Sequence, residues 1–347
     1  MHDPSQPHQP QPSGWPSEAE HQAVGGPAGR PYYPGPQPWQ APPPPARWTV
    51  PPPPGARYDH LARTPVHRWW RPLAGTAVIA VAFVGVSLVV LLAGVIVAGL
   101  AGVPVVMEVG RLFADPVFEL AVMLLSIAAV LPFVFLTAWL VQRRPPGTLS
   151  SVAGRLRWGW LFLCTGVALV ALILGQLAMT ATYAATGADM GDLFGWVGWD
   201  RFLPGLIVIV LLVPFQAATE EYVFRGWVIQ AFGAYFRTPW PGILFGAAVF
   251  TSLHAYTDWG IVDVFSFGVL MGWLAVRTGG LEAPIALHVI NNVVSFLPAA
   301  ASGDLGDALR QGAVPWQAIS GTVVQLGFFA VVVVIIAQKR AIQTVSR

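Results

Sequence analysis

The sequence contains little charge and almost no cysteine. Only 10% of its 347 residues are Asp, Glu, Lys or Arg, whereas soluble domains carry about 25%. The single cysteine, Cys164, excludes an intrachain disulfide framework and a cysteine-based metal site. The net charge of +2 provides no strongly basic surface, so we expect no nucleic-acid partner. These absences argue against a soluble, disulfide-bonded or nucleic-acid-binding protein.

Apolar residues are abundant and lie in long runs. They make up 55% of the chain, and a helix needs about 20 of them to cross a hydrocarbon core about 30 Å thick. The short alternating segments of a membrane β-barrel are not seen. We therefore predict an all-α, polytopic membrane protein embedded in a lipid bilayer, with about eight transmembrane helices. The apolar segments are 73–100, 118–141, 158–184, 202–236, 240–255, 261–277, 282–298 and 318–338.

Residues 1–70 form a separate, proline-rich region. They hold 19 of the 32 prolines and few aliphatic residues. Such a segment cannot bury enough apolar surface to offset its ordering entropy. We predict a disordered cytoplasmic tail with polyproline II stretches, followed by a membrane-embedded domain at residues 71–347. A solvated tail is the simpler interpretation, and a partner with a proline-binding domain is the functional alternative.

Positive charges are divided unequally between the two predicted sides of the membrane. One side would hold only Arg111, Arg201 and Arg310. The other would hold Arg57, Arg63, Arg68, Arg71, Arg143, Arg144, Arg155, Arg157, Arg237, Arg277, Lys339, Arg340 and Arg347. Because cytoplasmic loops carry an excess of Lys and Arg, we predict a multi-pass protein of the cell membrane with both termini in the cytoplasm. The excess of arginine over lysine suggests a GC-rich bacterial genome.

Charged side chains at membrane depth first appear in the stretch "EEYVFR". Such groups cost about 2.5–3.5 kcal/mol each on insertion scales, so they are functional candidates. Glu221 and Arg225 are four residues apart on one helix face and can form an ion pair. Glu220 is rotated by about 100° from Glu221. The alternative, a cytoplasmic helix end with snorkelling charges, is disfavoured by the apolar residues on both sides.

Two further stretches contain the two histidines of the membrane region. In "FTSLH" one turn separates Phe250 from His254, and in "HVINN" His288 and Asn292 are four residues apart. Taken singly, His254 is compatible with a structural role, and His288 with Asn292 is compatible with interhelical hydrogen bonding. Asn291 points away from the face that His288 and Asn292 share.

The three stretches can meet in space. Glu220 and His254 are each 17 residues from Arg237, which lies at the turn "RTPWP" between the fourth and fifth segments. A helical hairpin closed there returns both residues to similar depth. His288 lies about 12–14 Å from the start of the seventh segment, at a helical rise of 1.5 Å per residue. We therefore predict one site in the cytoplasmic half of the membrane.

These stretches resemble the CPBP family, also called Abi, which includes CAAX prenyl endopeptidases and bacteriocin-processing or immunity proteins. The family motifs are E-E-x-x-x-R, F-x-x-x-H and H-x-x-x-N, in this order on successive membrane helices. Here they read "EEYVFR", "FTSLH" and "HVINN". The resemblance covers residues 202–298 and leaves the proline-rich tail outside.

The resemblance implies an intramembrane endopeptidase acting on a membrane-associated protein or peptide. Glu220 would be the catalytic carboxylate, with His254 as its partner on the attacking water. His288 and Asn292 would stabilise the oxyanion, and Glu221 with Arg225 would hold the shape of the site. Peptide hydrolysis needs such a base, a proton donor and oxyanion donors.

Two questions stay open at this point. The family has been read both as metalloproteases and as glutamate proteases, and Glu220, His254 and His288 can ligate zinc. We favour the reading without a metal or other cofactor, and the sequence has no H-E-x-x-H motif. The alternative function is a non-enzymatic protein of the same fold, with an immunity, scaffold or transport role. Residues 73–201 lack a matching polar motif, which disfavours a transporter built from inverted repeats.

Overall fold

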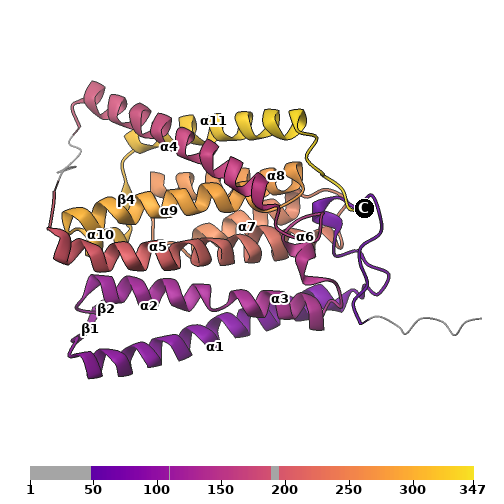
Figure 1. Cartoon of the computed structure of the whole chain (residues 1–347), viewed down its shortest axis with the longest axis horizontal. Helices are drawn as coiled ribbons and strands as arrows, with labels where there is room; N and C mark the ends of the chain where they lie inside the picture. Colours follow the sequence, from indigo (N-terminus) through magenta and orange to yellow (C-terminus); the bar gives the residue numbers. More distant parts are fainter. Residues whose placement is uncertain (1–47, 109, 189–194) are drawn as a thin grey trace, which may run out of the picture. The chain divides into compact units, whose positions relative to one another are not determined.

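The described part of the chain is largely helical (Figure 1). The computed structural model describes residues 48–108, 110–188 and 195–347. The α-helices are α1 (Trp70–Ala101), α2 (Pro116–Ala128), α3 (Leu131–Leu140), α4 (Trp158–Thr186), α5 (Trp199–Glu221), α6 (Ile229–Gly233), α7 (Trp240–Ser252), α8 (Trp259–Thr278), α9 (Glu282–Ser302), α10 (Leu305–Arg310) and α11 (Gln317–Lys339). The π-helix η3 (Tyr222–Val228) joins α5 to α6, and η1 (Tyr58–His60) and η2 (Pro146–Leu149) are short 3-10 turns. The predicted all-α fold class is confirmed.

The little β-structure forms two short pairs. Strand β1 (Val105–Glu108) is antiparallel to β2 (Arg111–Phe113), and β3 (Thr257–Asp258) is parallel to β4 (Ala313–Val314). The pairing of β3 with β4 brings the starts of α8 and α11 to the same end of the helix bundle. The short strands therefore connect helices and form no layer of their own.

Seven helical segments in the described residues are long and apolar enough to cross a membrane. They are Trp70–Ala101, Pro116–Leu140, Trp158–Thr186, Trp199–Gly233, Trp259–Thr278, Glu282–Ser302 and Gln317–Lys339. The predicted eighth, at 240–255, contains the 13-residue helix α7, which is about 20 Å long. This is shorter than a hydrocarbon core about 30 Å thick. The helix ends at Ser252, so His254 lies beyond it. The predicted number of eight is thus corrected to seven spanning segments and one shorter helix.

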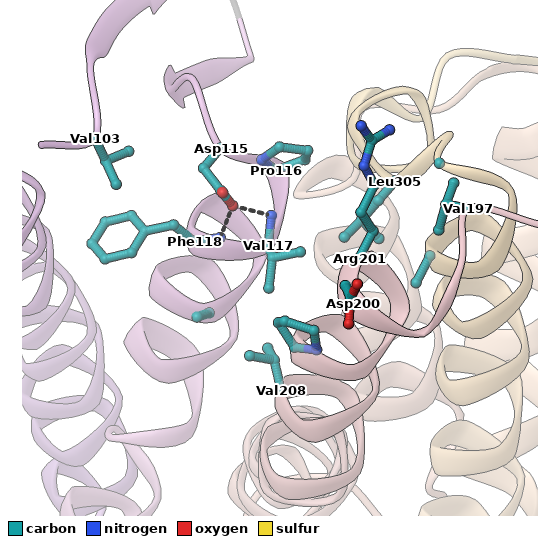
Figure 2. A pocket seen from close by; sticks show the side chains of 14 residues that line it. Val103, Asp115, Pro116, Val117, Phe118, Val197, Asp200, Arg201, Val208 and Leu305 are labelled. Atoms are coloured by element: carbon teal, nitrogen blue, oxygen red, sulfur yellow. Dashed lines mark hydrogen bonds between the residues drawn. The ribbon is translucent and has the colours of Figure 1, made fainter. Parts of the chain in front are cut away.

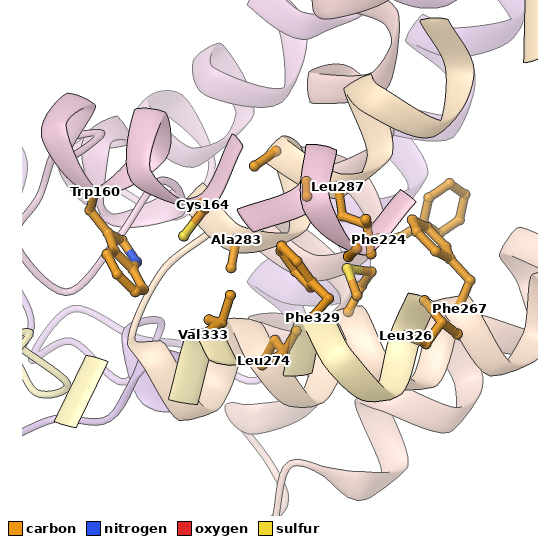
Figure 3. Close-up of a cluster of buried hydrophobic side chains, with 14 of the residues drawn as sticks. Trp160, Cys164, Phe224, Phe267, Leu274, Ala283, Leu287, Leu326, Phe329 and Val333 are labelled. Atoms are coloured by element: carbon orange, nitrogen blue, oxygen red, sulfur yellow. The ribbon is translucent and has the colours of Figure 1, made fainter. Parts of the chain in front are cut away.

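The helices pack in an order that places α5 and α9 together. Figure 1 shows α5 beside α9, with α1, α2 and α3 on one side and α4 and α11 on the other. Helix α7 packs against α8. A cluster of buried apolar side chains joins α4, α8, α9 and α11, including Cys164, Leu274, Leu287 and Phe329 (Figure 3). The single cysteine is therefore a buried core residue.

The two sets of positively charged residues, predicted for the two sides of the membrane, lie at opposite ends of the helices. Residues 55–57 pair with residues 345–346, so the start of the described domain and the C-terminal segment share one end. The Arg57 guanidinium donates to the carbonyl oxygen of Arg237 at that same end. At the other end Arg310 lies 3.9 Å from Glu108. The start of the described domain and the C-terminal segment thus lie at the same end of the bundle, while the cytoplasmic assignment stays a prediction.

The N-terminal segment 48–69 is packed against the helices. Tyr58 and Leu61 are fully buried, and the Tyr58 hydroxyl donates to the carbonyl oxygen of Leu149. The contact with Gly233 is close, because an added Cβ there would lie 1.8 Å from the Asp59 carbonyl oxygen. Residues from 48 thus pack on the helices, where aromatic and aliphatic anchors follow the proline runs, and the division of the chain at residue 70 stays a prediction. Residues 1–47 lie outside the described residues.

Replacing Tyr58 by alanine tests this packing. Truncating a buried aromatic residue costs about 3–5 kcal/mol of unfolding free energy, so we expect a clear loss of thermal stability in detergent. Trp48 on the same segment is 50% exposed, and Trp48→Ala is the matched control with a small expected effect. Equal stability of the two variants would contradict a packed segment.

Candidate active site

The first predicted stretch lies where α5 passes into a π-helix. Glu220 and Glu221 are the last two residues of α5, and Arg225 lies in the π-helix η3. A π-segment inside a helix is rare and often accompanies a functional site, because it changes the direction of the side chains that follow. The segment directs the Arg225 side chain into the protein, where its exposed fraction is 2%.

Glu221 is the centre of a buried hydrogen-bonded group. Its Oε1 accepts from Arg225 Nη1 at 2.9 Å and from His288 Nδ1 at 2.7 Å. The Glu221 side chain has no exposed surface. The predicted ion pair between residues 221 and 225 is thus present. The contact with His288 lies beyond the sequence prediction, since spacing along one helix gives no information on partners across helices.

His288 also faces Glu220. Its Nε2 lies 3.3 Å from Glu220 Oε2, in a contact that is not aligned as a hydrogen bond. Because the ionised Glu221 only accepts, Nδ1 of His288 must carry a proton. The buried group thus brings two carboxylates, one guanidinium and one imidazole into contact.

Aromatic rings surround the charged group. The Arg225 guanidinium carbon lies 4.4 Å from the ring centroid of Phe250 and 5.6 Å from that of Phe267. Both rings also contact the His288 imidazole edge to face, at 5.8 and 5.3 Å between centroids. The rings exclude water and attract the cation through their π-faces, so the ion pair lies in a medium where its electrostatic interactions are strong.

The predicted hairpin between residues 220 and 254 is present. Helix α7 packs against η3 and α6, and Phe224 contacts Phe250 at 5.4 Å between ring centroids. Phe224 lies four residues after Glu220 and Phe250 four residues before His254. The contact between them therefore agrees with the predicted similar depth of Glu220 and His254.

His254 lies beside the group without bonding to it. Its Nδ1 is 2.8 Å from the Phe250 carbonyl oxygen, to which it donates. Its ring lies 4.6 Å from the Phe250 ring and stacks on Tyr256 at 6.2 Å. Within the described residues, no hydrogen bond or ion pair joins His254 to the other predicted site residues. The donated Nδ1 proton leaves Nε2 as the acceptor for a water molecule or substrate.

Asn292 is bound to a residue that the motifs did not include. Its Nδ2 donates to Gln216 Oε1 at 2.9 Å. The sequence feature that could have identified Gln216 is a glutamine at membrane depth, four residues before Glu220. Asn291 points away as predicted, since its Oδ1 accepts from Gln325 of α11 at 2.7 Å.

A cavity lies away from this group, between the starts of α2 and α5, and has a volume of about 680 Å³. Figure 2 shows the side chains that line it. Asp115, Asp200 and Arg201 are among its lining residues. Asp115 already accepts from the backbone nitrogens of Val117 and Phe118, as a helix cap. Because Asp200 and Arg201 begin the helix that Glu220 ends, this cavity is at the opposite end of α5 from the candidate site.

The ligand set of the alternative, metal-dependent hypothesis is Glu220, His254 and His288. No group of three or more His, Cys, Asp or Glu side chains in the described ranges is placed to hold a metal ion. Glu220 and His288 are in contact, while His254 uses Nδ1 on the Phe250 carbonyl. These side chains therefore do not form a three-ligand zinc site in the described residues, and the favoured mechanism without a metal stays a prediction.

The fold and the site define a multi-pass helical membrane protein with a buried Glu–His–Arg group between two helices. Residues 201–294 match the sequence model of a known family, described as "Type II CAAX prenyl endopeptidase Rce1-like". This match confirms the resemblance to CPBP proteins that the three motifs indicated, over the same part of the chain.

Two curated bacterial proteins are similar to this chain. "Uncharacterized protein YyaK" of Bacillus subtilis (strain 168) is 24% identical over 187 residues, which are 52% of this chain and 61% of that protein. An "Uncharacterized 24.3 kDa protein" of Escherichia coli is 30% identical over 102 residues, 28% of this chain and 47% of that protein. The chain thus spans less than two thirds of either relative. No solved structure matches it.

Proposed function

We propose that this protein is an intramembrane endopeptidase that hydrolyses a peptide bond of a membrane-associated protein or peptide. The observation that carries the proposal is the contact between His288 and Glu220, held by the Glu221–Arg225 ion pair. A carboxylate in contact with an imidazole, both largely shielded from solvent, is an arrangement that acid–base catalysis uses. The match to the Rce1-like family supports the same class of reaction.

The proposed reaction begins with a water molecule held by Glu220 and His254 Nε2. Glu220 takes a proton from this water as its oxygen forms a bond to the peptide carbonyl carbon. The carbonyl oxygen becomes an oxyanion, which accepts from Asn292 Nδ2 and from the Nε2–H of His288. Glu220 then gives its proton to the leaving nitrogen as the C–N bond breaks. Glu221 keeps the imidazole of His288 in its orientation throughout.

No metal takes part in this scheme. A metal-dependent reaction would require Nε2 of His254 to approach Glu220 and His288 as a third ligand. The measurement is the zinc content of the purified protein, with cleavage before and after zinc removal. One zinc per chain, with cleavage lost on removal and regained when zinc is restored, would contradict the proposed mechanism.

The membrane sidedness belongs to the same proposal. The site lies in the half of the bundle that ends at Arg237, because Glu220 is separated from that turn by η3 and α6. The arginine-rich end would face the cytoplasm at the cell membrane. The substrate bond to be cleaved would then reach the site from the cytoplasmic half of the bilayer. A proline-binding partner for the proline-rich region 1–70 remains a prediction, and residues 1–47 of that region lie outside the described residues.

A comparison of membrane proteomes tests the function. Cells that express the wild-type protein are compared with cells that express Glu220→Gln, which preserves the size of the side chain but is not a base. We expect at least one peptide terminus in a membrane-associated protein to be lost in the variant. Asp307→Asn, at the exposed opposite end, is the control and should keep that terminus. An unchanged set of termini would favour the non-enzymatic alternative.

A further inference from the structure

Helices α5 and α9 contact each other through two polar pairs, one turn apart. Glu220 faces His288 in one pair, and Gln216 accepts a hydrogen bond from Asn292 in the other. On each helix the two members are four residues apart, so they share one face. Glu220, His288 and Asn292 have predicted roles in hydrolysis, and Gln216 is the fourth member of the same contact.

The bond from Asn292 to Gln216 fixes how the asparagine amide is turned. The amide can present either its oxygen or its nitrogen in a given direction. Gln216 Oε1 accepts, so the Asn292 nitrogen is held on the side of α5, which is the side of Glu220. One N–H of that nitrogen is used by Gln216 and the second is left to donate. An amide turned by 180° would present an oxygen instead, and an oxyanion would be repelled.

Gln216 is held in place for this purpose. It is 5% exposed at membrane depth, and it lies one turn before Glu220 on a helix that packs along α9. A buried polar side chain is costly in this setting unless it is bonded. An apolar residue at this position would leave the Asn292 amide without its acceptor, so the presence of glutamine is tied to Asn292.

We propose that Gln216 is a positioning residue that holds the Asn292 amide with its nitrogen toward the oxyanion. This inference rests on the proposed function. It concerns the orientation of one donor, and it leaves the roles of Glu220 and His254 unchanged.

The chain contains a matched control for this role. Asn291 and Gln325 form a second asparagine–glutamine hydrogen bond, at 2.7 Å between α9 and α11. It starts at the neighbouring residue of α9 and points away from Glu220. Gln216→Met and Gln325→Met each remove one interhelical bond while nearly conserving side-chain volume. A purely structural role predicts the same behaviour for both variants.

The assay uses a synthetic peptide that spans the cleavage site lost in Glu220→Gln cells, with the purified full-length protein. We expect Gln216→Met to lower kcat by about 10- to 100-fold, since misplacing a catalytic group can cost up to about 100-fold, with KM changed less than about twofold. We expect Gln325→Met to keep kcat within about twofold. In an Asn292→Ala background, adding Gln216→Met should change kcat by less than about twofold, because the two residues act through one donor.

Two outcomes overturn the inference in different ways. In the first, the wild-type protein cleaves the peptide, but Gln216→Met behaves like Gln325→Met, or the effects of Gln216→Met and Asn292→Ala on kcat multiply. The positioning role is then wrong while the proposed function stands. If Glu220→Gln removes no peptide terminus and the wild-type protein cleaves nothing, the proposed function fails and the positioning role fails with it.

Discussion

Glu221→Ala is expected to lose both stability and turnover. The substitution leaves the Arg225 guanidinium buried without its carboxylate, and breaking a buried pair in this way costs about 3–5 kcal/mol. It also removes the acceptor for His288 Nδ1, so the imidazole is no longer held toward Glu220. The measurement is thermal stability in detergent, together with cleavage per folded molecule.

A second buried ion pair separates these two effects. Arg157 and Glu282 lie 2.7 Å apart near the start of α9, with no exposed surface on the Glu282 side chain. Glu282→Ala should lose comparable stability, yet the protein that remains folded should cleave within a few fold of wild type. If both variants kept equal turnover per folded molecule, Glu221 would be a purely structural carboxylate.

Exchanging the partners of the first pair gives a further distinction. The variant with Glu221→Arg and Arg225→Glu restores an opposite-charge pair on one helix face. It should recover part of the lost stability. It should recover no cleavage, because the guanidinium introduced by Glu221→Arg would donate toward His288 Nδ1, where an acceptor is required. Full recovery of cleavage would show that the direction of this bond is unimportant.

Local spacing predicted the parts of the site that belong to one helix. The ion pair between residues 221 and 225 follows from a separation of four residues, and the opposite directions of Asn291 and Asn292 follow from the 100° rotation between neighbours. The hairpin at Arg237 was predictable because a polar turn separates two apolar segments. These features depend on chain geometry alone.

Contacts across helices were not predictable in the same way. The bond from His288 to Glu221 and the bond from Asn292 to Gln216 depend on how α5 and α9 are rotated against each other. A single sequence carries no record of that rotation. The depth of His254 was predicted, but its hydrogen bond was not, because α7 ends at Ser252 and the His254 imidazole bonds to the Phe250 carbonyl. The packed segment 48–69 was hidden because its few anchors follow a long run of prolines.

Glu220 and His288 are expected to behave as one catalytic unit. Glu220→Gln removes the proposed base, and His288→Gln removes both the imidazole that contacts Glu220 and a proposed oxyanion donor. Each change should lower turnover by about 10³-fold or more, and the double variant should be little worse than either single variant, since residues of one unit have non-additive effects. The measurement is kcat on the peptide that spans the identified cleavage site.

Stability distinguishes these variants from those of Glu221. The Glu220 side chain is 14% exposed and makes no aligned hydrogen bond through Oε2 in the described residues, so Glu220→Gln should unfold within a few degrees of wild type. The same structure therefore predicts that two neighbouring carboxylates respond differently: removing the charge of Glu220 stops the reaction in a folded protein, whereas removing Glu221 also weakens the fold. If Glu220→Gln retained full cleavage, or unfolded as readily as Glu221→Ala, this division between the two glutamates would be wrong.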